Sequence, residues 1–300
     1  MNELVSVVIP TYNYAHFLCN AVDSVLAQTY RNIEIIVVDD GSSDNTSEIA
    51  KGYGARINYI YQANRGLSAA RNAGIRVAGG EFIAFLDADD MWMPDKIMKQ
   101  VQVLKDHGAV GAVGSNLYQV DENLRDLAVV KNKNYAPEKF SRELLFFNIV
   151  GGGGSSILLR KECFRVAGLF DEELRAAEDW DMWLRISKKF SIRNIDEPLV
   201  KIRLGSYSMS HMGNAQKMLD NELIVLKKYF GHGFSLLKGK AISQRYFSAA
   251  WAFSTQGRNK DAFFGMCRCF MFYPMALFQK NKVGLYVKVI KDIIFGRGEK

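Results

Sequence analysis

The chain has 300 residues, of which 48% are hydrophobic and 24% are charged. This balance is typical of a folded globular protein, and it excludes a disordered chain. The length predicts one large or two modest domains. Since the sequence contains no unbroken apolar stretch of about 18 residues, a membrane-spanning helix is not expected. The N-terminus lacks the basic region and long apolar segment of a secretory signal. Four cysteines do not form a disulfide framework in a chain of this length, so we expect a cytoplasmic location.

The net charge of +7 is unevenly distributed along the chain. Residues 211–300 contain 15 Lys and Arg against 5 Asp and Glu, whereas the first 210 residues contain 24 against 27. This segregation predicts a neutral-to-acidic working domain followed by a basic region suited to an anionic surface. The alternative is that the basic region only improves solubility.

Strand and helix patterns alternate in the first hundred residues, and the strands are almost continuously apolar. Such alternation predicts a parallel sheet covered by helices on both faces. We expect strands at 5–9, 33–38, 57–61 and 82–86, and helices at 17–26, from 45 onward, and at 66–78.

Beyond Pro94 the alternation is less regular. We expect helices at 94–107 and 178–187, strands within 110–120 and at 156–159, and helices throughout from 215 onward. The run Gly151–Gly154 is interpreted as a pliant loop rather than a phosphate cradle. These patterns predict an α/β catalytic domain at 1–212, divided at 114 and 115 into a nucleotide-binding and an acceptor half, and a basic helical extension at 213–300.

Three of the predicted strands end in polar residues. These are Pro10-Thr11-Tyr12-Asn13, Asp39-Asp40-Gly41-Ser42 and Asp87-Ala88-Asp89-Asp90. Since ligands of an open parallel sheet bind outside the carboxyl ends of the strands, we expect these groups to converge at one edge. Tyr12 offers a ring for stacking on a base, and Asp39 and Asp40 offer carboxylates for a ribose or a base. An ordinary loop aromatic is the simpler interpretation of Tyr12 taken alone.

Several carboxylates at one strand end repel each other unless a cation compensates them. Their hard oxygen atoms suit Mg²⁺ or Mn²⁺, which keep waters and bridge substrate phosphates. Asp87 and Asp89 are therefore candidates for a metal site, whereas Asp90 alone is better explained as a cap of the next helix. The sequence contains no Gly-x-Gly-x-x-Gly, P-loop or His-Glu-x-x-His motif, so dinucleotide redox chemistry, P-loop phosphate transfer and a zinc site lack support. Separately, no nucleic-acid partner is expected.

Five short motifs occur in order along the first hundred residues. They are Pro10-Thr11-Tyr12-Asn13, Val37-Val38-Asp39-Asp40-Gly41-Ser42-Ser43-Asp44, Asn64-x-Gly66, Ala70-Arg71-Asn72-x-Gly74 and Phe85-Leu86-Asp87-Ala88-Asp89-Asp90. With Gly168-Leu169-Phe170-Asp171 and Glu178-Asp179-Trp180-Asp181, the set resembles glycosyltransferase family 2 over roughly the first 210 residues. The resemblance implies the GT-A fold, a Rossmann-like, mostly parallel sheet with helices on both faces. It also implies inverting, metal-dependent transfer of a hexose from a nucleotide sugar, with UDP as the expected nucleotide.

The resemblance also implies roles for individual residues. Asp179 would be the catalytic base, and Asp89 would bind Mn²⁺ or Mg²⁺ on the donor diphosphate. Donor-binding roles would fall to Pro10, Thr11, Tyr12, Asp39, Asp40, Arg71, Asp87 and Ala88. Arg71 would either steady the diphosphate or pair with a strand-end aspartate. Glu178, Asn13, Asn72, Arg203 and His211 would have supporting or undecided roles.

The resemblance implies a saccharide or lipid-linked saccharide acceptor in cell-surface polysaccharide synthesis. Basic and aromatic residues after 213 suit helices lying on an anionic membrane, which would place the protein at the inner face of the cytoplasmic membrane. Packing on the catalytic domain or a homodimer contact explains the same apolar residues. Two other functions remain open: a sugar-nucleotidyltransferase, and a non-catalytic nucleotide-sugar-binding protein of the same fold.

Overall fold

The computed structural model describes residues 3–204, 215–233 and 235–294. The chain divides into two compact units, Met1–Ser206 and Tyr207–Lys300. The boundary predicted at 212 and 213 lies outside the described residues.

The first unit contains a mixed sheet in the order β3-β2-β1-β4-β8-β6-β9-β5, with β7 paired to β6. Its first four strands, β3 (Asn58–Tyr61), β2 (Ile33–Asp39), β1 (Val5–Thr11) and β4 (Phe82–Phe85), are mutually parallel, as the alternating sequence pattern predicts. Strand β1 extends beyond its predicted end and includes Pro10, which pairs with Val38 of β2. Proline is tolerated there because the β4 ladder ends at Val8, before its missing N–H would be required.

The rest of the sheet mixes parallel and antiparallel pairs. β8 (Leu158–Arg160) is antiparallel to both β4 and β6 (Val110–Val120), and β6 is parallel to β9 (Ser191–Arg203). Strands β5 (Met91–Trp92) and β7 (Asp126–Val130) pair antiparallel with β9 and β6. Sequence patterning did not predict β5, β7 or β9. In β9, exposed positions interrupt the buried ones, so neither clean alternation nor an apolar run marks the strand.

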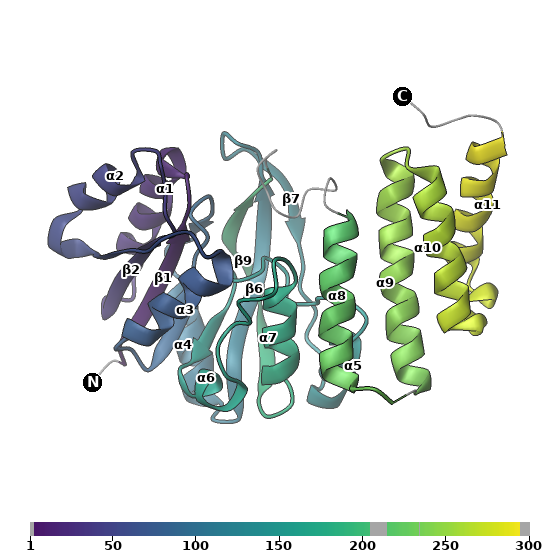
Figure 1. The fold of residues 1–300 in the computed structure, drawn as a ribbon. Coiled ribbons are helices and arrows are strands. Elements are labelled where there is room, and N and C mark those ends of the chain that lie inside the picture. Colours follow the sequence, from purple (N-terminus) through teal and green to yellow (C-terminus); the bar gives the residue numbers. More distant parts are fainter. Residues whose placement is uncertain (1–2, 205–214, 234, 295–300) are drawn as a thin grey trace. The chain divides into compact units, whose positions relative to one another are not determined.

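Helices cover both faces of the parallel strands (Figure 1). α1 (Ala15–Leu26) shares a core with Val7 and Ile9 of β1, whereas α3 (Leu67–Val77) lies on the opposite face, where Gly74 meets Val8. α4 (Lys96–Asp106) packs on β6, β8 and β9. The remaining helices of this unit are α2 (Thr46–Gly52), η1 (Gly54–Arg56), α5 (Pro137–Leu144), α6 (Glu162–Ala167) and α7 (Glu178–Ile186).

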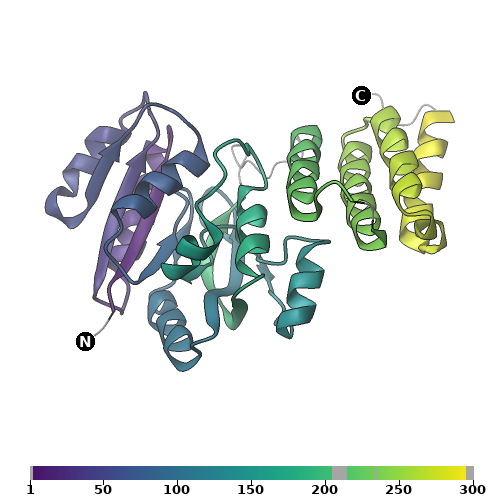
Figure 2. The same cartoon turned by 60° about the horizontal axis from the view of Figure 1, so that its bottom comes forward.

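The second unit is helical in its described residues, as predicted. α8 (Ala215–Phe230), α9 (Leu236–Thr255), α10 (Asn259–Phe272) and α11 (Lys280–Ile294) lie side by side, and η3 (Pro274–Phe278) joins the last two (Figure 2). Tyr246, Phe253, Met266, Leu285 and Val289 belong to their buried core. Among the described helices, none is both long enough and apolar enough to cross a membrane.

Candidate active site

The carboxyl ends of β1, β2 and β4 meet at one edge of the sheet, as the parallel topology requires. Thr11 is paired with Asp39, and its carbonyl accepts a hydrogen bond from the backbone N–H of Asp40. On the other side of β1, the N–H of Leu86 donates to the carbonyl of Val8. The three polar segments that follow these strands therefore share one edge.

Asp39 and Asp40 both use their carboxylates to organise the loops around them. Asp39 is fully buried, and it accepts hydrogen bonds from the Ser42 backbone N–H at 2.8 Å and the Tyr59 hydroxyl at 2.7 Å. Asp40 accepts from three donors between 2.6 and 2.9 Å. These donors are the Gln62 side chain and the backbone N–H groups of Arg65 and Gly66. In this structure both carboxylates hold neighbouring loops, and their predicted contact with a nucleoside stays a prediction.

The segment after β1 supplies one accessible ring. Tyr12 is 48% exposed, whereas Pro10 and Thr11 are buried at the strand end. Asn13 has a positive φ of 55° and accepts a 2.8 Å hydrogen bond from the Ser43 backbone N–H. Asn13 thus fastens this loop to the loop after β2, which leaves the Tyr12 ring facing solvent and open to a stacking partner.

Arg71 of α3 joins the end of β4 to the start of α7. Its Nη2 lies 2.9 Å from Oδ1 of Asp87, and its Nη1 lies 2.8 Å from Oε1 of Glu178. The guanidinium also lies near the rings of Phe85 and Phe170, with its Cζ at 5.9 and 5.4 Å from their centroids. Burial alone would lower the pKa of Arg71, but the two carboxylates raise it above its usual value. Of the two roles expected for Arg71, the structure shows pairing with a strand-end aspartate.

The Asp87–Asp90 segment combines one buried carboxylate, Asp90, with two partly exposed ones, Asp87 and Asp89. Asp90 is buried, and it accepts hydrogen bonds from the Ser155 hydroxyl at 2.6 Å and the Arg203 backbone N–H at 3.1 Å. Asp89 is partly exposed, and burial together with the Asp87 carboxylate raises its pKa to about 6. Within the described part of the chain, no side chain donates a hydrogen bond to the Asp89 carboxylate, since Arg203 donates to the backbone carbonyl of Asp89. Ala88, between Asp87 and Asp89, is buried.

Two residues with undecided roles hold loops of the site in place. Arg203 donates from Nε to the backbone carbonyl of Asp89 at 2.9 Å, and its guanidinium lies 4.1 Å from the centroid of the Phe17 ring. Asn72 exchanges two 2.9 Å hydrogen bonds with the backbone of Phe170. Both side chains therefore position backbone rather than project freely into solvent. His211 lies outside the described residues.

The strand-end acids fit a divalent cation that a substrate helps to hold. In the described ranges, no group of three or more His, Cys, Asp or Glu side chains is arranged to hold a metal alone. A hard cation of the Mg²⁺ type needs only one or two carboxylates when substrate phosphates and waters complete its shell. Asp89 is partly exposed, and burial and the Asp87 carboxylate raise its pKa, although the Arg203 guanidinium partly opposes that rise. The oxygen chemistry of these carboxylates is thus compatible with Mn²⁺ or Mg²⁺, and the ligand role of Asp89 stays a prediction.

Asp179 is the second residue of α7, directly after Glu178, and thus lies beside the Arg71 network. Its Oδ1 accepts from the Trp180 backbone N–H at 2.6 Å, and its Oδ2 accepts from the Asn148 side chain at 2.9 Å. A Cβ added at Gly153 would lie 3.6 Å from Oδ2. Burial, with a further contribution from Glu178, raises the pKa of Asp179 to about 6. Its carboxylate is thus half protonated near pH 6 and ionised above pH 7.

Sequence analysis missed Asn148, Gly153 and Ser155 as parts of this site. The loop 151–154 was interpreted as a pliant connection, but it lies against Asp179 and Arg71. Ser155 accepts from the Asp87 backbone N–H and donates to Asp90. The sequence signal for this loop was the run of four glycines at 151–154 followed by Ser155 and Ser156. Side chains at the glycine positions would fill the space beside the carboxylates.

Comparison with known proteins identifies the family of this chain. The family model described as "Glycosyl transferase family 2" matches residues 6–167. An uncharacterised glycosyltransferase of Rickettsia typhi is 35% identical over 243 residues, which cover 75% of this chain and 76% of that protein. Another, EpsJ of Bacillus subtilis, is 33% identical over 226 residues, which cover 71% of this chain and 64% of EpsJ.

Solved structures show the same fold at low sequence identity. S. aureus TarS 1–349 superposes with a TM-score of 0.68 at 18% identity, covering 98% of this chain and 92% of that one. The same protein has also been solved in complex with UDP-GlcNAc, where the TM-score is 0.66 at 16% identity, covering 98% of this chain and 92% of that one. The mannosyltransferase PcManGT from Pyrobaculum calidifontis, in complex with GDP-Man and Mn²⁺, superposes with a TM-score of 0.58 at 18% identity over 99% of this chain and 88% of its own. The family model and the sequence relatives show that the chain belongs to glycosyltransferase family 2, and its sheet and the solved structures show that it has the GT-A fold.

Proposed function

We propose that this protein is an inverting, metal-dependent glycosyltransferase that moves a sugar from a UDP-linked donor to a hydroxyl of a saccharide or lipid-linked saccharide. The observation that carries the proposal is the Arg71 bridge. It connects Asp87 at the donor edge with Glu178, and therefore brings the adjacent Asp179 to the same edge. The UDP-GlcNAc complex of TarS supports the donor class. Surface-polysaccharide synthesis is the expected pathway.

The chain's own residues suit both donor binding and removal of the proton from the acceptor hydroxyl. Tyr12 would stack on the base, and the loops held by Asp39 and Asp40 would enclose the nucleoside. Asp89, with Asp87 beside it, would hold Mn²⁺ or Mg²⁺, which supplies Lewis-acid stabilisation of the leaving diphosphate. Asp179, ionised above its pKa of about 6, would accept the proton of the acceptor hydroxyl. Displacement from the face opposite the leaving group inverts the anomeric configuration.

Thermal-shift measurements with UDP, UDP-GlcNAc and GDP, with and without Mn²⁺, test the donor site. Bound ligand stabilises the folded state by about 2.7 kcal/mol at 100 times Kd, so a true donor raises Tm measurably. We expect UDP and UDP-GlcNAc to raise Tm only when Mn²⁺ is present, and we expect Asp89→Asn to abolish this rise. Asp106→Asn, an exposed acid at the end of α4, is the control and should retain it. A full Mn²⁺-dependent shift in Asp89→Asn would remove Asp89 from the site.

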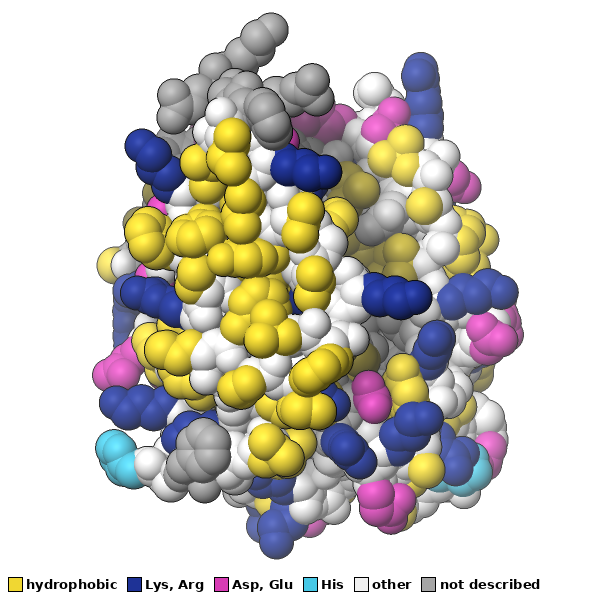
Figure 3. Space-filling view, turned by 90° about the vertical axis from the view of Figure 1, so that its right-hand side faces the viewer, with side chains coloured by type: hydrophobic (Ala, Val, Ile, Leu, Met, Phe, Trp, Pro, Cys, Tyr) yellow, Lys and Arg dark blue, Asp and Glu magenta, His cyan; other side chains and the backbone are white. Residues whose placement is uncertain are grey.

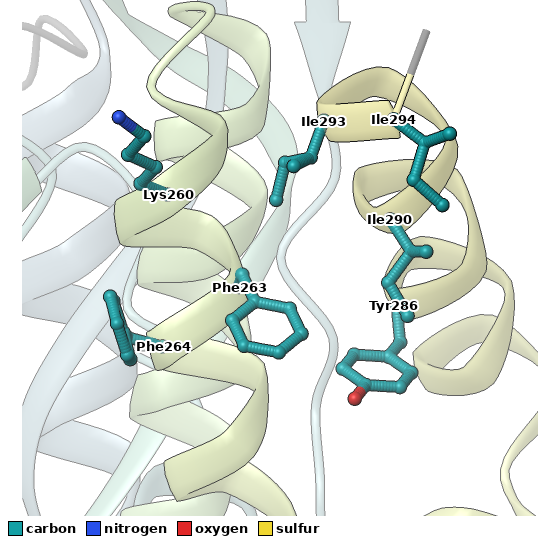
Figure 4. A pocket seen from close by; sticks show the side chains of 7 residues that line it. All are labelled: Lys260, Phe263, Phe264, Tyr286, Ile290, Ile293 and Ile294. Atoms are coloured by element: carbon teal, nitrogen blue, oxygen red, sulfur yellow. The ribbon is translucent and has the colours of Figure 1, made fainter.

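We propose further that the face formed by α10 and α11 docks on an anionic membrane. Hydrophobic side chains gather on this face, with Lys and Arg among them (Figure 3). Phe264, Met271, Phe278 and Ile294 are each more than 60% exposed. A groove of about 490 Å³ lies between the two helices, lined by Phe263, Tyr286 and isoleucines, with Lys260 at its edge (Figure 4).

Charge complementarity favours a bilayer over a second copy of the chain. From α10 to α11 the described residues outside the core carry Lys260, Arg268, Lys280, Lys288 and Lys291 against Asp261 and Asp292, whereas Lys282 is buried. Two such faces brought together would repel, whereas anionic headgroups attract the lysines and arginines while the apolar side chains enter the acyl boundary. Attachment at the inner face of the cytoplasmic membrane is part of this proposal.

Flotation with phosphatidylglycerol vesicles, compared with phosphatidylcholine vesicles, tests the docking face. We expect the chain to float only with the anionic vesicles, and Phe264→Glu combined with Phe278→Glu to lower its recovery at least tenfold. Leu127→Glu, which changes a 59% exposed residue of β7, is the matched control. Equal recovery of all variants would contradict membrane docking. If instead the parent chain does not float, and light scattering shows a dimer that Phe264→Glu dissociates, the face binds a second copy of the chain.

A further inference from the structure

The carboxylate of Asp179 is held from two sides. On one side, the backbone N–H of Trp180 fixes Oδ1 at 2.6 Å, from within the same helix. On the other, the side-chain amide of Asn148 donates to Oδ2 at 2.9 Å from a different part of the chain, 31 positions away. Two donors on two oxygens restrict rotation of the carboxylate about its χ2 angle. One of these donors depends entirely on where the loop after α5 lies.

The neighbour of Oδ2 on the loop side is a residue without a side chain. Gly153 has a φ of +52°, and a Cβ built there would lie 3.6 Å from Oδ2. The amide of Asn148 and the backbone at Gly153 thus border the same oxygen atom. Oδ2 keeps a further lone pair after it accepts from Asn148, so it can still receive a proton. A glycine at this position prevents a side chain from filling the space beside it.

We propose that Asn148 is a positioning residue for Asp179, which it holds with Oδ2 directed into the space that Gly153 leaves open for the acceptor hydroxyl. This inference rests on the proposed function, because it takes Asp179 as the base. It assigns the segment from Asn148 to Gly153 to the wall of the acceptor site. Asn148 itself does not exchange a proton in this scheme.

The electrostatics of the site gives Asn148 a second effect. Burial and the Glu178 carboxylate raise the pKa of Asp179, whereas Arg71, the Trp180 N–H and the Asn148 amide stabilise its charged form. Among the residues that the structure describes, Glu178 and Arg71 are the charged groups that act on the Asp179 carboxylate. Loss of the Asn148 donor therefore raises the pKa of Asp179 further. Since the hydrogen bond favours the charged carboxylate but Asn148 is exposed to competing water, we expect the pKa of Asp179 to rise by roughly 0.5–1 pH unit.

A thermal-unfolding cycle tests the inference without any substrate. The four proteins are the parent chain, Asn148→Ala, Asp179→Asn and the double variant, each measured at pH 5 and pH 8. In the parent background, Asn148→Ala should lower Tm by about 2 °C more at pH 8, where Asp179 is ionised, than at pH 5. In the Asp179→Asn background, the effect of Asn148→Ala should be the same at both pH values.

A purely structural role for Asn148 would lower Tm equally at both pH values in both backgrounds, and that result would overturn the inference. Turnover gives a second readout, with UDP-GlcNAc, Mn²⁺ and release of UDP as the probe reaction. We expect Asn148→Ala to shift the acidic limb of the kcat profile upward by roughly 0.5–1 pH unit, at unchanged KM for the donor. A uniform loss of kcat at every pH would also overturn it. Absence of turnover in the parent chain would instead contradict the proposed donor, and the thermal cycle would still decide the role of Asn148.

Discussion

Arg71 of α3 and Glu178 of α7, which are 107 positions apart in the sequence, form a buried ion pair with 2.8 Å between Nη1 and Oε1. The Arg71 side chain is 2% exposed and that of Glu178 is 9% exposed. The same guanidinium binds Asp87 at the end of β4. One cation thus fixes the start of α7 relative to the strand-end acids, and this relationship determines where Asp179 lies.

Replacing Arg71 with methionine should destabilise the protein strongly. The substitution leaves Glu178 buried without its partner, and breaking a buried pair in this way costs about 3–5 kcal/mol. Urea unfolding at pH 8 measures the loss. Arg76→Met on the same helix is the matched control, because Arg76 is 54% exposed and should lose less than about 1 kcal/mol. Equal midpoints for the two variants would show that the bridge contributes little.

Tyr12→Ala should weaken UDP binding without changing stability. The ring is 48% exposed in the free protein, so its removal uncovers little apolar core. Stacking on a base contributes about 1–3 kcal/mol, which corresponds to a loss of roughly 5- to 150-fold in affinity. Calorimetry with UDP and Mn²⁺ measures this loss, and Tyr12→Phe should retain parental affinity. If Tyr12→Ala binds UDP as the parent does, the base lies elsewhere.

Gly74→Ala should destabilise the first unit by about 1–3 kcal/mol or more. A Cβ at this position would lie 2.3 Å from Cγ1 of Val8 and 2.8 Å from its Cγ2, so α3 must move away from the sheet. The expected result is a lower urea midpoint, together with weaker ligand binding, because Arg71 lies on the same helix. Gly108→Ala has no neighbour within 4 Å and serves as the control. A Gly74→Ala midpoint equal to that of the control would contradict the close packing of α3 on β1.

Alkylation should distinguish the cysteines of the folded protein. Burial raises the pKa of Cys163 to about 12, so its thiol is protonated at pH 8, and it has no access to reagent. Cys19 on α1 is exposed. Iodoacetamide at pH 8, followed by mass spectrometry of the peptides, should label Cys19 at least tenfold faster than Cys163. The difference should disappear in concentrated urea. Fast labelling of Cys163 in the native protein would show that α6 opens readily.

The local sequence determined the strands, the helices and the polar segments of the donor edge. Thr11, Asp39 and Asp87 lie at or just after the ends of apolar strands that run in the same direction. The carboxyl ends of parallel strands meet at one edge of the sheet, independently of how the rest of the chain folds. The position of the acids of this edge therefore follows from motif order and from topology. The basic, helical character of the C-terminal region was equally visible in composition and periodicity.

Tertiary structure alone decided how these side chains are used. Asp40 holds the backbone at Arg65 and Gly66, Arg71 binds Asp87 and Glu178, and Asn148 reaches Asp179. Each contact joins residues that no local pattern connects, because packing of distant loops sets which donor meets which carboxylate. Strand β9 was missed for a related reason, since its exposed and buried positions depend on its neighbours β6 and β5 rather than on its own alternation. Periodicity records which face of an element is buried, whereas the partner on that face is fixed only when the whole chain has folded.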